Sequence, residues 1–401
     1  MWLSLSIKNL FRNFRRTVAI LCTVALGTGA LFSFDGFIHG VLEELRDTTI
    51  HANYGYGQIH TKAYRGNVFE EPTKHWISHG KPLEDFLYGI DGVNDVFPRV
   101  GFSALLKHGS VTVSSSGQGV EAEREAKFFH SLNIEEGSAL TTERNGILLG
   151  HGLARALRAS PGDEITVIAT STKGVINKDK FVVTGIFYTG SVHFDSRVFR
   201  IQLPAAQHLL KTSRIESIAL GLKHLSDWDF VESQIETYFP DLEATPFHVL
   251  DKINYQHSVD WLKAQFNVVQ IIILSIVLLG IFNSLSASIL ERKQEIGNLR
   301  ANGESVFQVM RLIMTEGFLL AIFGSLLGMG TAYSLLMLFI NKGLLMPPGP
   351  GQTRQFLVTF SFTWSMVSFS LLLSSIAAIF ASFLAGIKVA KMSIAKSLRA
   401  H

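Results

Sequence analysis

Cysteine is almost absent from this chain, in which Cys22 is the only one among 401 residues. A disulfide within the chain is therefore excluded, and any part facing an oxidising compartment must be stabilised by an ordinary hydrophobic core. Charge is scarce as well, since charged residues make up 17% of the chain and the mean hydropathy is +0.26. A soluble protein of this length rarely has so apolar a composition, which indicates a membrane protein.

Motifs of nucleotide-binding and hydrolytic sites are also missing. The sequence contains no G-x-x-x-x-G-K-[ST] loop to bind nucleotide phosphates and no G-x-S-x-G nucleophile motif. His75 and His79 have the i, i+4 spacing of zinc ligands on a helix, but no glutamate lies between them. This pattern favours two surface histidines over a metal site. We therefore expect no enzyme activity, no metal and no cofactor on this chain.

Four long uncharged runs account for the positive hydropathy. Each can cross a hydrocarbon core, which needs about 20 apolar residues in a helix. We expect transmembrane helices at 17–39, 264–290, 315–340 and 356–387. A cleavable signal peptide is the alternative for the first run, but no A-x-A-like site follows it and its helical pattern continues through Arg46.

Positive charge is concentrated in the membrane part of the chain. Residues 35–263 carry 29 acidic and 22 basic side chains, whereas the remainder carries 4 acidic and 14 basic ones. Basic residues lie in 1–16, in 388–401 and in the segment Glu291–Glu316, so the positive-inside rule places these segments in the cytoplasm. The domain 40–260 and the loop 341–355 then lie outside. This distribution favours contact with anionic membrane lipid and gives no support to nucleic-acid binding.

The expected fold is a membrane α-helical protein with four transmembrane helices and a large α+β domain inserted between helices 1 and 2. Residues 1–16 have the pattern of an amphipathic helix on the membrane surface, and 388–401 form a basic tail. In the domain 40–260, strands interleaved with short helices predict an α+β fold in two lobes. The predicted strands are Gln58–Thr61, Ser110–Ser114, Ile165–Ala169, Phe181–Tyr188 and Val198–Leu203, and the predicted helices are Pro82–Gly89, Gly150–Leu157 and Pro204–Leu210.

Small residues recur at four-residue intervals in the last two runs. This spacing lets helix backbones approach closely, either within one chain or at the seam of a dimer. The residues predicted to pack in this way are Gly324, Gly328, Ser374, Ala378, Ser382 and Gly386.

The segment 291–311 between the second and third runs, which we name the coupling segment, is the most informative motif. A short charged helix with Ile296 and Leu299 on one side, followed by a turn at Gly303, predicts a compact knob below the membrane. We expect the two apolar side chains to fill a groove of a partner protein, with the charged residues at the rim of the contact. An ordinary solvated loop is the alternative. The predicted coupling residues are Glu291, Arg292, Glu295, Ile296, Leu299, Arg300 and Gly303.

The pattern E-R-x-x-E-I-G-x-L-R-A-x-G at Glu291–Gly303, followed by a glycine-rich run, resembles the signature of FtsX-type permeases in the MacB and LolC/LolE group. The region between the first two runs is similar to the periplasmic core domain of the same group. Its matching motifs are Gly146–Leu157, Pro161–Ile165, Phe181–Ile186 and the stretch from Asp195 to Gln207. The likeness covers nearly the whole chain.

This resemblance implies an ABC transporter permease in the bacterial inner membrane, with its large domain in the periplasm. Such a permease pairs with a second permease copy, as a homodimer or a related heterodimer. It binds two copies of a LolD-like or MacB-like ATPase, which hold the ATP and Mg²⁺, and it transmits their closure to the periplasm. Unlike MacB, this sequence has no fused nucleotide-binding domain, so the resemblance implies a separate ATPase chain.

The resemblance leaves the output open. Release of lipoproteins is the leading prediction, and efflux of an amphiphile through a membrane-fusion protein and outer-membrane duct is the alternative. In lipoprotein-releasing relatives a long loop recruits a periplasmic chaperone, but the corresponding stretch Ser171–Lys180 is short here, which weakens the prediction of that partner. A regulator of cell-wall hydrolases would usually have a smaller external domain, and a membrane sensor without transport would not need the coupling segment.

Overall fold

A computed structural model describes residues 14–67, 72–78, 81–143, 145–340, 342–348 and 355–390. The chain divides into two compact units. The helical unit comprises the chain up to Glu43, Asp260–Leu345 and the chain from Leu357 onward. The sheet unit comprises Glu44–Val259 together with Met346–Phe356.

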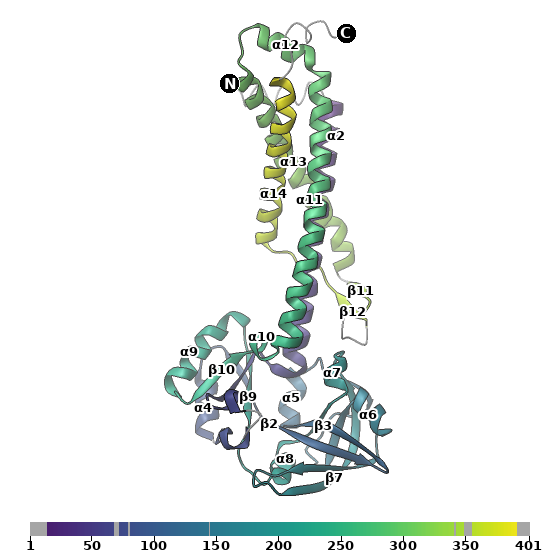
Figure 1. Cartoon of the computed structure of the whole chain (residues 1–401), viewed down its shortest axis with the longest axis vertical. Helices are drawn as coiled ribbons and strands as arrows, with labels where there is room; N and C mark the ends of the chain where they lie inside the picture. The colour runs from purple at the N-terminus through teal and green to yellow at the C-terminus, as the bar shows by residue number, and fades with distance from the viewer. Residues whose placement is uncertain are drawn as a thin grey trace. The chain divides into compact units, whose positions relative to one another are not determined.

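Four helices of the described chain are long and apolar enough to cross a membrane, judged by length and composition (Figure 1). They are α2 (Phe14–Thr49), α11 (His257–Glu291), α13 (Val306–Ile340) and α14 (Trp364–Ala390). A short helix, α12 (Lys293–Ala301), separates α11 from α13, and two short strands, β11 (Leu344–Met346) and β12 (Phe356–Val358), form a hairpin between α13 and α14.

The four expected spans correspond to these helices, but several bounds differ. Helix α2 continues ten residues beyond 39, to Thr49, and α13 begins at Val306, inside the coupling segment. The fourth span begins at Trp364 and not at 356, because 356–358 form a strand. An apolar run does not by itself distinguish strand from helix, and this one is rich in aromatic and β-branched residues. Residues 1–13 and 391–401, most of the predicted interfacial helix and tail, lie outside the described residues.

Apolar side chains from α2, α11, α12, α13 and α14 form the core of the helical unit. Three buried hydroxyl groups add polar contacts within this core. The Thr28 oxygen lies 3.1 Å from that of Ser325 and 2.9 Å from that of Ser374, so hydrogen bonds join α2 to both α13 and α14. In an apolar medium each such hydroxyl needs a partner, and the three satisfy one another.

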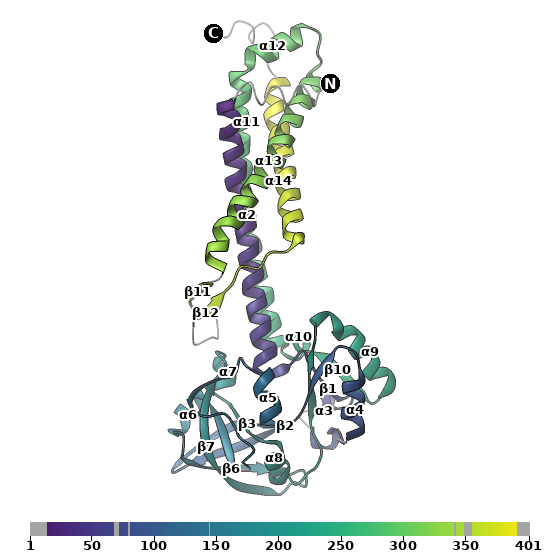
Figure 2. The same cartoon turned by 180° about the vertical axis from the view of Figure 1, so that it is seen from behind.

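The sheet unit contains one ten-stranded sheet, in the order β10-β1-β9-β2-β3-β8-β5-β7-β4, with β6 beside β2 and β7. Figure 2 labels β1, β2, β3, β6, β7 and β10 of this sheet. The strands are β1 (Gly57–Thr61), β2 (Val93–His108), β3 (Val111–Val120), β4 (Asn133–Gly137), β5 (Gly146–Gly150), β6 (Glu164–Thr170), β7 (Ile176–Tyr188), β8 (Val198–Gln202), β9 (Ser217–Leu222) and β10 (Leu242–Pro246). The α-helices are α3 (Tyr64–Asn67), α4 (Lys81–Gly89), α5 (Ala122–Phe128), α6 (His151–Leu157), α7 (Val192–Asp195), α8 (Leu203–Leu210), α9 (Trp228–Tyr238) and α10 (Phe247–Leu250). The remaining turns are η1 (Ile50–Tyr54), η2 (Pro72–His75), η3 (Leu225–Asp227) and η4 (Lys252–Gln256).

Strand β2 is shared between two parts of the sheet. Its first half, up to Arg99, pairs with β9, which continues to β1 and β10. Its second half pairs with β3 and β6, which lead to the other strands. Predicted strands are present at β1, β3, β6, β7 and β8, and predicted helices at α4, α6 and α8. Strand β3 ends six residues later than expected, and β7 begins five residues earlier. Strands β2, β4, β5, β9 and β10 of this sheet were not predicted.

Candidate functional site

The coupling segment forms a compact structure in which a turn at Gly303 ends its helix. Helix α11 ends at Glu291, the chain turns at Arg292, and α12 ends where Gly303 adopts φ +100°. The Gly303 amide donates to the Arg300 carbonyl and the Glu304 amide to the Leu299 carbonyl, both at 3.2 Å. This is the Schellman arrangement that ends helices at a glycine, and the predicted turn is therefore present.

Helix α13 starts immediately afterwards with its own cap. The Gln308 amide donates to the Ser305 hydroxyl at 3.2 Å, and the Ser305 amide donates to the Gln308 side-chain oxygen at 2.6 Å. These reciprocal bonds form a capping box, which satisfies amides that would otherwise be unpaired at the helix start. The segment thus joins α11 to α13 through two fixed turns.

A buried ion pair braces the coupling segment against α13. An Arg292 guanidinium nitrogen lies 2.7 Å from a Glu316 carboxylate oxygen, and both side chains are almost fully buried. A second contact joins Arg292 to Glu295 at 3.1 Å. Breaking a buried pair from one side costs about 3–5 kcal/mol, because a charge is left without compensation. Arg292 therefore acts inside the chain and does not lie at the rim of a partner contact.

Ile296 faces the helical bundle of its own chain. It is 6% exposed and packs among apolar residues of α11 and α13, and Leu299 is partly buried beside it. The expectation that both side chains fill a partner's groove is therefore wrong for Ile296, which has no free face. The apolar side of α12 was identified from the sequence, but the pattern could not show whether the chain itself or a partner covers it. Only a cavity of about 20 Å³ remains in this contact.

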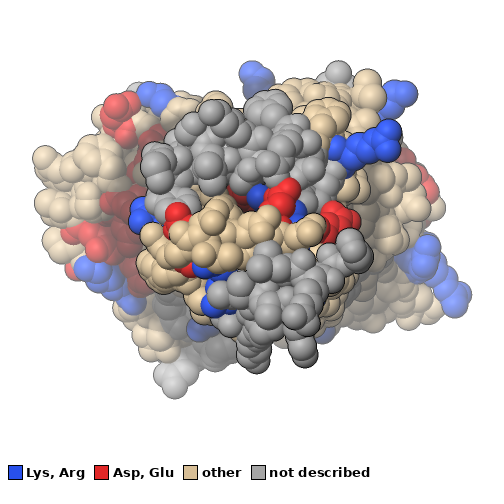
Figure 3. Space-filling view, turned by 90° about the horizontal axis from the view of Figure 1, so that it is seen from above, with Lys and Arg blue, Asp and Glu red and all other residues tan. Residues whose placement is uncertain are grey.

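The exposed face of α12 consists of other residues. Gln294, Asn298 and Ala301 are exposed, and their spacing of three and four residues places them along one side of α12. Glu291, the last residue of α11, is exposed as well. Phe307, in the first turn of α13, is 76% exposed. Figure 3 looks down on this end of the helices, where acidic and basic side chains lie beside uncharged ones. Among the described residues 290–307, the large apolar side chains that are strongly exposed are Leu290 and Phe307.

The predicted packing residues lie at contacts between helices of the same chain. A side chain on Gly324 would meet Val24, and one on Gly328 would come within 2.2 Å of the Ala25 carbonyl oxygen. Ser374, Ala378 and Ser382 are buried, and Gly386 lies near Met310 at ordinary contact distance. These contacts are made without a second copy of the chain.

A buried charge cluster in the sheet unit, which we name the charge clasp, was not predicted. It consists of Arg99 on β2, Glu125 on α5 and Arg200 on β8, with Asn53 and Gln118 around them. Arg99 makes two hydrogen bonds to the Glu125 carboxylate, at 2.6 and 2.8 Å, and Arg200 makes a third at 3.3 Å. Two guanidinium groups share one carboxylate, which leaves a net positive charge inside the cluster.

The clasp uses its remaining donors to hold η1, the turn that directly follows α2. Arg200 donates to the Ala52 carbonyl at 3.1 Å, and Arg99 donates to the Asn53 carbonyl. Carbonyl groups at a helix end lack partners within the helix and carry partial negative charge, so buried cations stabilise them. Burial lowers the pKa of Arg200 to about 10, an effect that Glu125 partly offsets, so Arg200 remains charged near neutral pH.

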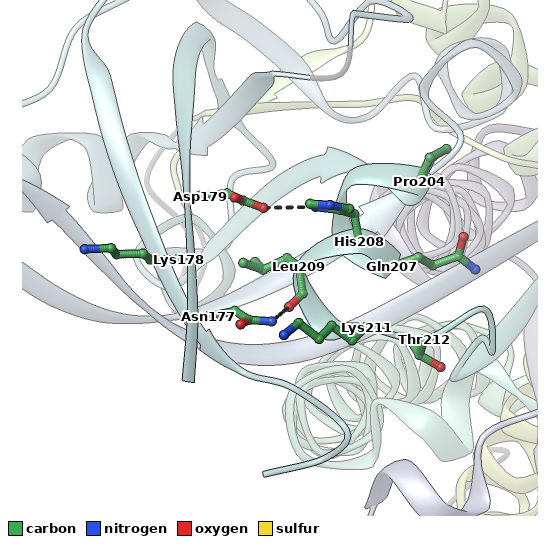
Figure 4. A pocket seen from close by; sticks show the side chains of 9 residues that line it. All are labelled: Asn177, Lys178, Asp179, Pro204, Gln207, His208, Leu209, Lys211 and Thr212. Carbon is green, nitrogen blue, oxygen red and sulfur yellow. Dashed lines mark hydrogen bonds and ion pairs between the residues drawn. The ribbon is translucent and has the colours of Figure 1, made fainter. Parts of the chain in front are cut away.

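An open cleft of about 540 Å³ lies between β7 and α8. In Figure 4, Asp179 and His208 point toward each other across the cleft, and Asn177 reaches the Leu209 carbonyl. The two bonds measure 3.4 and 2.8 Å. These polar side chains already satisfy one another, and no group of three or more potential metal ligands occurs in the described part of the chain. His79 of the predicted histidine pair lies outside the described residues.

The connection from β6 to β7, beside this cleft, is a tight turn. The Ser171 amide donates to the Val175 carbonyl at 2.8 Å, and Gly174 has φ +77°. Five residues, 171–175, link the two strands, so no long loop extends from the sheet at this point.

These features define a class: a protein with four helices long and apolar enough to cross a membrane, accompanied by a large sheet-containing unit. Two family models agree with it, since the FtsX-like permease C-terminal model matches residues 267–394 and the MacB-like periplasmic core domain model matches residues 17–238. The second match covers more than half of the chain. This chain therefore belongs to the FtsX-type ABC transporter permeases with a MacB-like periplasmic core domain.

Similar proteins carry names from the same group. The lipoprotein-releasing system transmembrane protein LolC of Neisseria meningitidis is 25% identical over 337 residues, which are 80% of this chain and 77% of that protein. LolE of Haemophilus influenzae is 22% identical over 64% of this chain and 63% of its own length. The periplasmic region of MacB from Actinobacillus actinomycetemcomitans matches with 14% identity and a TM-score of 0.36, covering 49% of this chain and 90% of that one.

Proposed function

We propose that this chain is the permease subunit of an ABC transporter, driven by a separate cytoplasmic ATPase that binds the ATP and Mg²⁺. The observation that supports this most is the braced coupling segment. The Arg292–Glu316 pair and the buried Ile296 fix it to the helical bundle, while one face of α12 and Phe307 stay exposed. A partner that pushes on such a surface moves the membrane helices with it, because no flexible linker intervenes.

The contact surface in this proposal differs from the one predicted from the sequence. Glu291 and Arg300 remain candidate contact residues, and Gln294, Asn298 and Phe307 join them. Ile296, Leu299 and Arg292 instead support this surface from behind, and Gly303 shapes the turn. Large aromatic side chains often dominate binding energy, so we assign the largest share of the contact to Phe307.

The orientation and assembly in this proposal follow the charge distribution and the family. Both termini and the coupling segment lie in the cytoplasm, and the sheet unit lies in the periplasm. Two permease copies, identical or related, bind two ATPase copies. The predicted packing glycines and serines already contact other helices of the same chain, so the contact between permease copies uses other faces of the helices.

The substrate that we propose is a lipoprotein or another amphiphile. Support comes from the similar LolC and LolE proteins, whose names place them in a lipoprotein-releasing system. The tight turn at 171–175 offers no extended loop to recruit a chaperone. This observation favours a second candidate, in which a membrane-fusion protein receives the substrate and passes it to an outer-membrane duct.

The test compares Phe307→Ala with Phe230→Ala, a matched change of an exposed phenylalanine in the sheet unit. The tagged full chain is expressed in its own host, and co-purified polypeptides carrying a G-x-x-x-x-G-K-[ST] motif are quantified together with ATP hydrolysis. Losing an aromatic hot spot costs at least about 2 kcal/mol, so we expect at least a tenfold loss of bound ATPase for Phe307→Ala only. Equal ATPase recovery from both variants would show that the contact lies elsewhere. Mass spectrometry of the lipid or protein bound to the complex then distinguishes the substrates.

A further inference from the structure

Two histidine rings lie against each other in the sheet unit. His51 belongs to η1, and His130 follows α5 by two residues. Their ring centroids are 4.4 Å apart and their planes differ by 23°, so the rings are stacked. The Phe128 ring also lies 4.6 Å from that of His51, and the Ser131 amide donates to the His51 carbonyl at 3.2 Å. The turn η1 is therefore held to the chain that leaves α5 by ring contacts and by a backbone hydrogen bond.

A hydrogen bond shows which nitrogen of His51 can take up a proton. The Nδ1 atom lies 2.9 Å from the Phe128 carbonyl oxygen. A carbonyl oxygen can only accept, so Nδ1 carries a hydrogen and Nε2 is the atom that becomes protonated in acid. The ring of His51 is half-buried, whereas His130 is exposed. Protonation of His51 therefore places a positive charge on a partly desolvated ring.

Charged groups lie on both sides of this ring. On α2, Asp47 favours a charged His51, but Arg46 lies 3.3 Å from Asp47 and partly neutralises it. Helix α5 contributes the uncharged Phe128, which follows the exposed Lys127. The charge clasp holds the residue after His51 and carries one net positive charge. A second cation beside His51 is thus opposed by more positive than negative charge.

These surroundings make the closed arrangement of the two rings sensitive to acid. Burial lowers the pKa of His51 below its usual value, and His130 adds to this effect, while the Phe128 carbonyl and Asp47 partly offset it. If η1 opens locally, His51 enters water and regains a pKa near 6.5. The open form then binds more protons than the closed form as the pH falls below about 6.5. Acid therefore favours opening, and the effect is complete below the pKa of the closed form.

We propose that the His51–His130 stack is a pH-sensitive latch, which separates when both rings are protonated and releases η1 from the chain that follows α5. Neutral imidazole rings stack, whereas two imidazolium rings at this separation repel each other. The clasp keeps its donors to the Ala52 carbonyl, because guanidinium groups stay charged in acid. One side of η1 is thus loosened while the other side is held. The latch is independent of the proposed ATPase and substrate.

Hydrogen exchange of the full chain in nanodiscs, at about pH 8 and about pH 5.5, tests the latch. The reporter is the Ser131 amide, which donates to the His51 carbonyl only in the closed form. Its rate is divided by that of an unstructured amide at the same pH, which gives a protection factor free of the chemical pH dependence. Peptides from the buried strand β9 report on unfolding of the whole sheet unit.

The decisive variant is His130→Phe, which keeps an aromatic ring but cannot become charged. His193→Phe, the same change at another exposed histidine, is the matched control. On acidification we expect the protection of Ser131 to fall about three- to tenfold in the parent and in His193→Phe, but less than about twofold in His130→Phe. Protection in β9 should stay constant in all three proteins.

Equal loss of protection in the parent and in His130→Phe would overturn the proposal, and so would constant protection in the parent. A parallel loss in β9 would also overturn it, because acid would then unfold the sheet unit as a whole. Deuterium exchange at the imidazole C2 carbon measures the pKa of each histidine separately. We expect the pKa of His51 to rise in His130→Phe, and an unchanged value would show that the two rings do not influence each other.

Discussion

Gly303 has a backbone conformation that side chains of L-residues rarely adopt, yet a Cβ at this position would meet no atom within 4 Å. Gly330 on α13 is equally open but has an ordinary helical conformation. The two glycines therefore form a matched pair. An alanine at Gly303 would be destabilised only by the positive φ, whereas an alanine at Gly330 would increase the helix propensity of α13.

We predict that Gly303→Ala destabilises the turn by about 1–2 kcal/mol, whereas Gly330→Ala is neutral or stabilising. Hydrogen exchange of the amides in 299–305 should then be about 5–30-fold faster in Gly303→Ala. Exchange in the Gly330→Ala protein should match the parent. Identical exchange in both variants would mean that the Schellman turn does not fix this segment.

Arg200 illustrates what a single sequence conceals. It lies 75 residues from Glu125 and more than 140 from Ala52, so only tertiary packing brings these groups together. The pairing of β3 with β8 places Arg200 opposite Gln118. The sequence shows an arginine in a strand, with no pattern that distinguishes it from an exposed one. Arg197, three residues earlier, is exposed, so neighbouring arginines in one stretch have opposite roles.

We predict that Arg200→Met lowers the stability of the sheet unit by about 3 kcal/mol, because the Ala52 carbonyl of η1 and the Glu125 carboxylate each lose a buried donor. For a domain of this size, that corresponds to a thermal midpoint roughly 6–12 °C lower. Arg197→Met is the control and should shift the midpoint little. Thermal unfolding of the full chain in nanodiscs measures both, and an unchanged midpoint for Arg200→Met would contradict a stabilising role for the clasp.

At the scale of elements, long membrane helices were accessible from the sequence because each needs an uninterrupted apolar run. The hairpin β11–β12 could not be predicted from the sequence, since each strand has only three residues and β12 lies within the apolar run that was expected to form the fourth span. In the sheet unit, β2 was missed because it is buried on both faces for part of its length and so lacks alternation. Periodicity predicts which face of α12 is apolar. Whether the same chain or a partner packs against that face depends on tertiary packing, which the sequence pattern does not show.

The contact between α2 and α13 depends on the absence of a side chain at Gly328. A Cβ there would lie 2.2 Å from a backbone oxygen of α2, which cannot move aside as a flexible side chain can. Gly330, two residues later, faces open space. The two positions separate a helix-packing effect from a general effect of a larger residue in this helix.

We predict that Gly328→Leu forces the two helices apart and destabilises the bundle by more than the 1–3 kcal/mol typical of overpacking. Gly330→Leu should leave the bundle intact. Each variant is heated in mild detergent to a series of temperatures and then passed over a size-exclusion column. The measured quantity is the fraction that still elutes as a monodisperse peak. Equal resistance of the two variants would show that this close approach is not required.

At the scale of the whole molecule, α2 is one continuous helix from Phe14 to Thr49, and the clasp holds the turn that follows it. The connection from β12 to α14 packs closely on the same helix, since a side chain on Gly40 would collide with the Thr359 carbonyl oxygen. The coupling segment, in turn, is braced to α13, which contacts α2 through Gly324 and Gly328. Rigid contacts therefore run from the proposed ATPase surface to α2, and α2 is the element on which movement would converge.

The orientation of the chain in the membrane provides the final prediction, since every mechanical role above assumes it. The termini and the coupling segment carry most of the basic charge outside 35–263, and short basic segments are retained on the cytoplasmic side. A pair of reporters, one active only in the cytoplasm and one only outside, should therefore report the outside for fusions after His51 and Asp251. The same pair should report the cytoplasm for fusions after Ala301 and His401. Four spans require both ends of the chain on one side, so a C-terminal fusion active only outside would rule out the four-span arrangement. An external reading at Ala301 would instead keep the helices but invert them, placing the coupling segment where no ATPase could reach it.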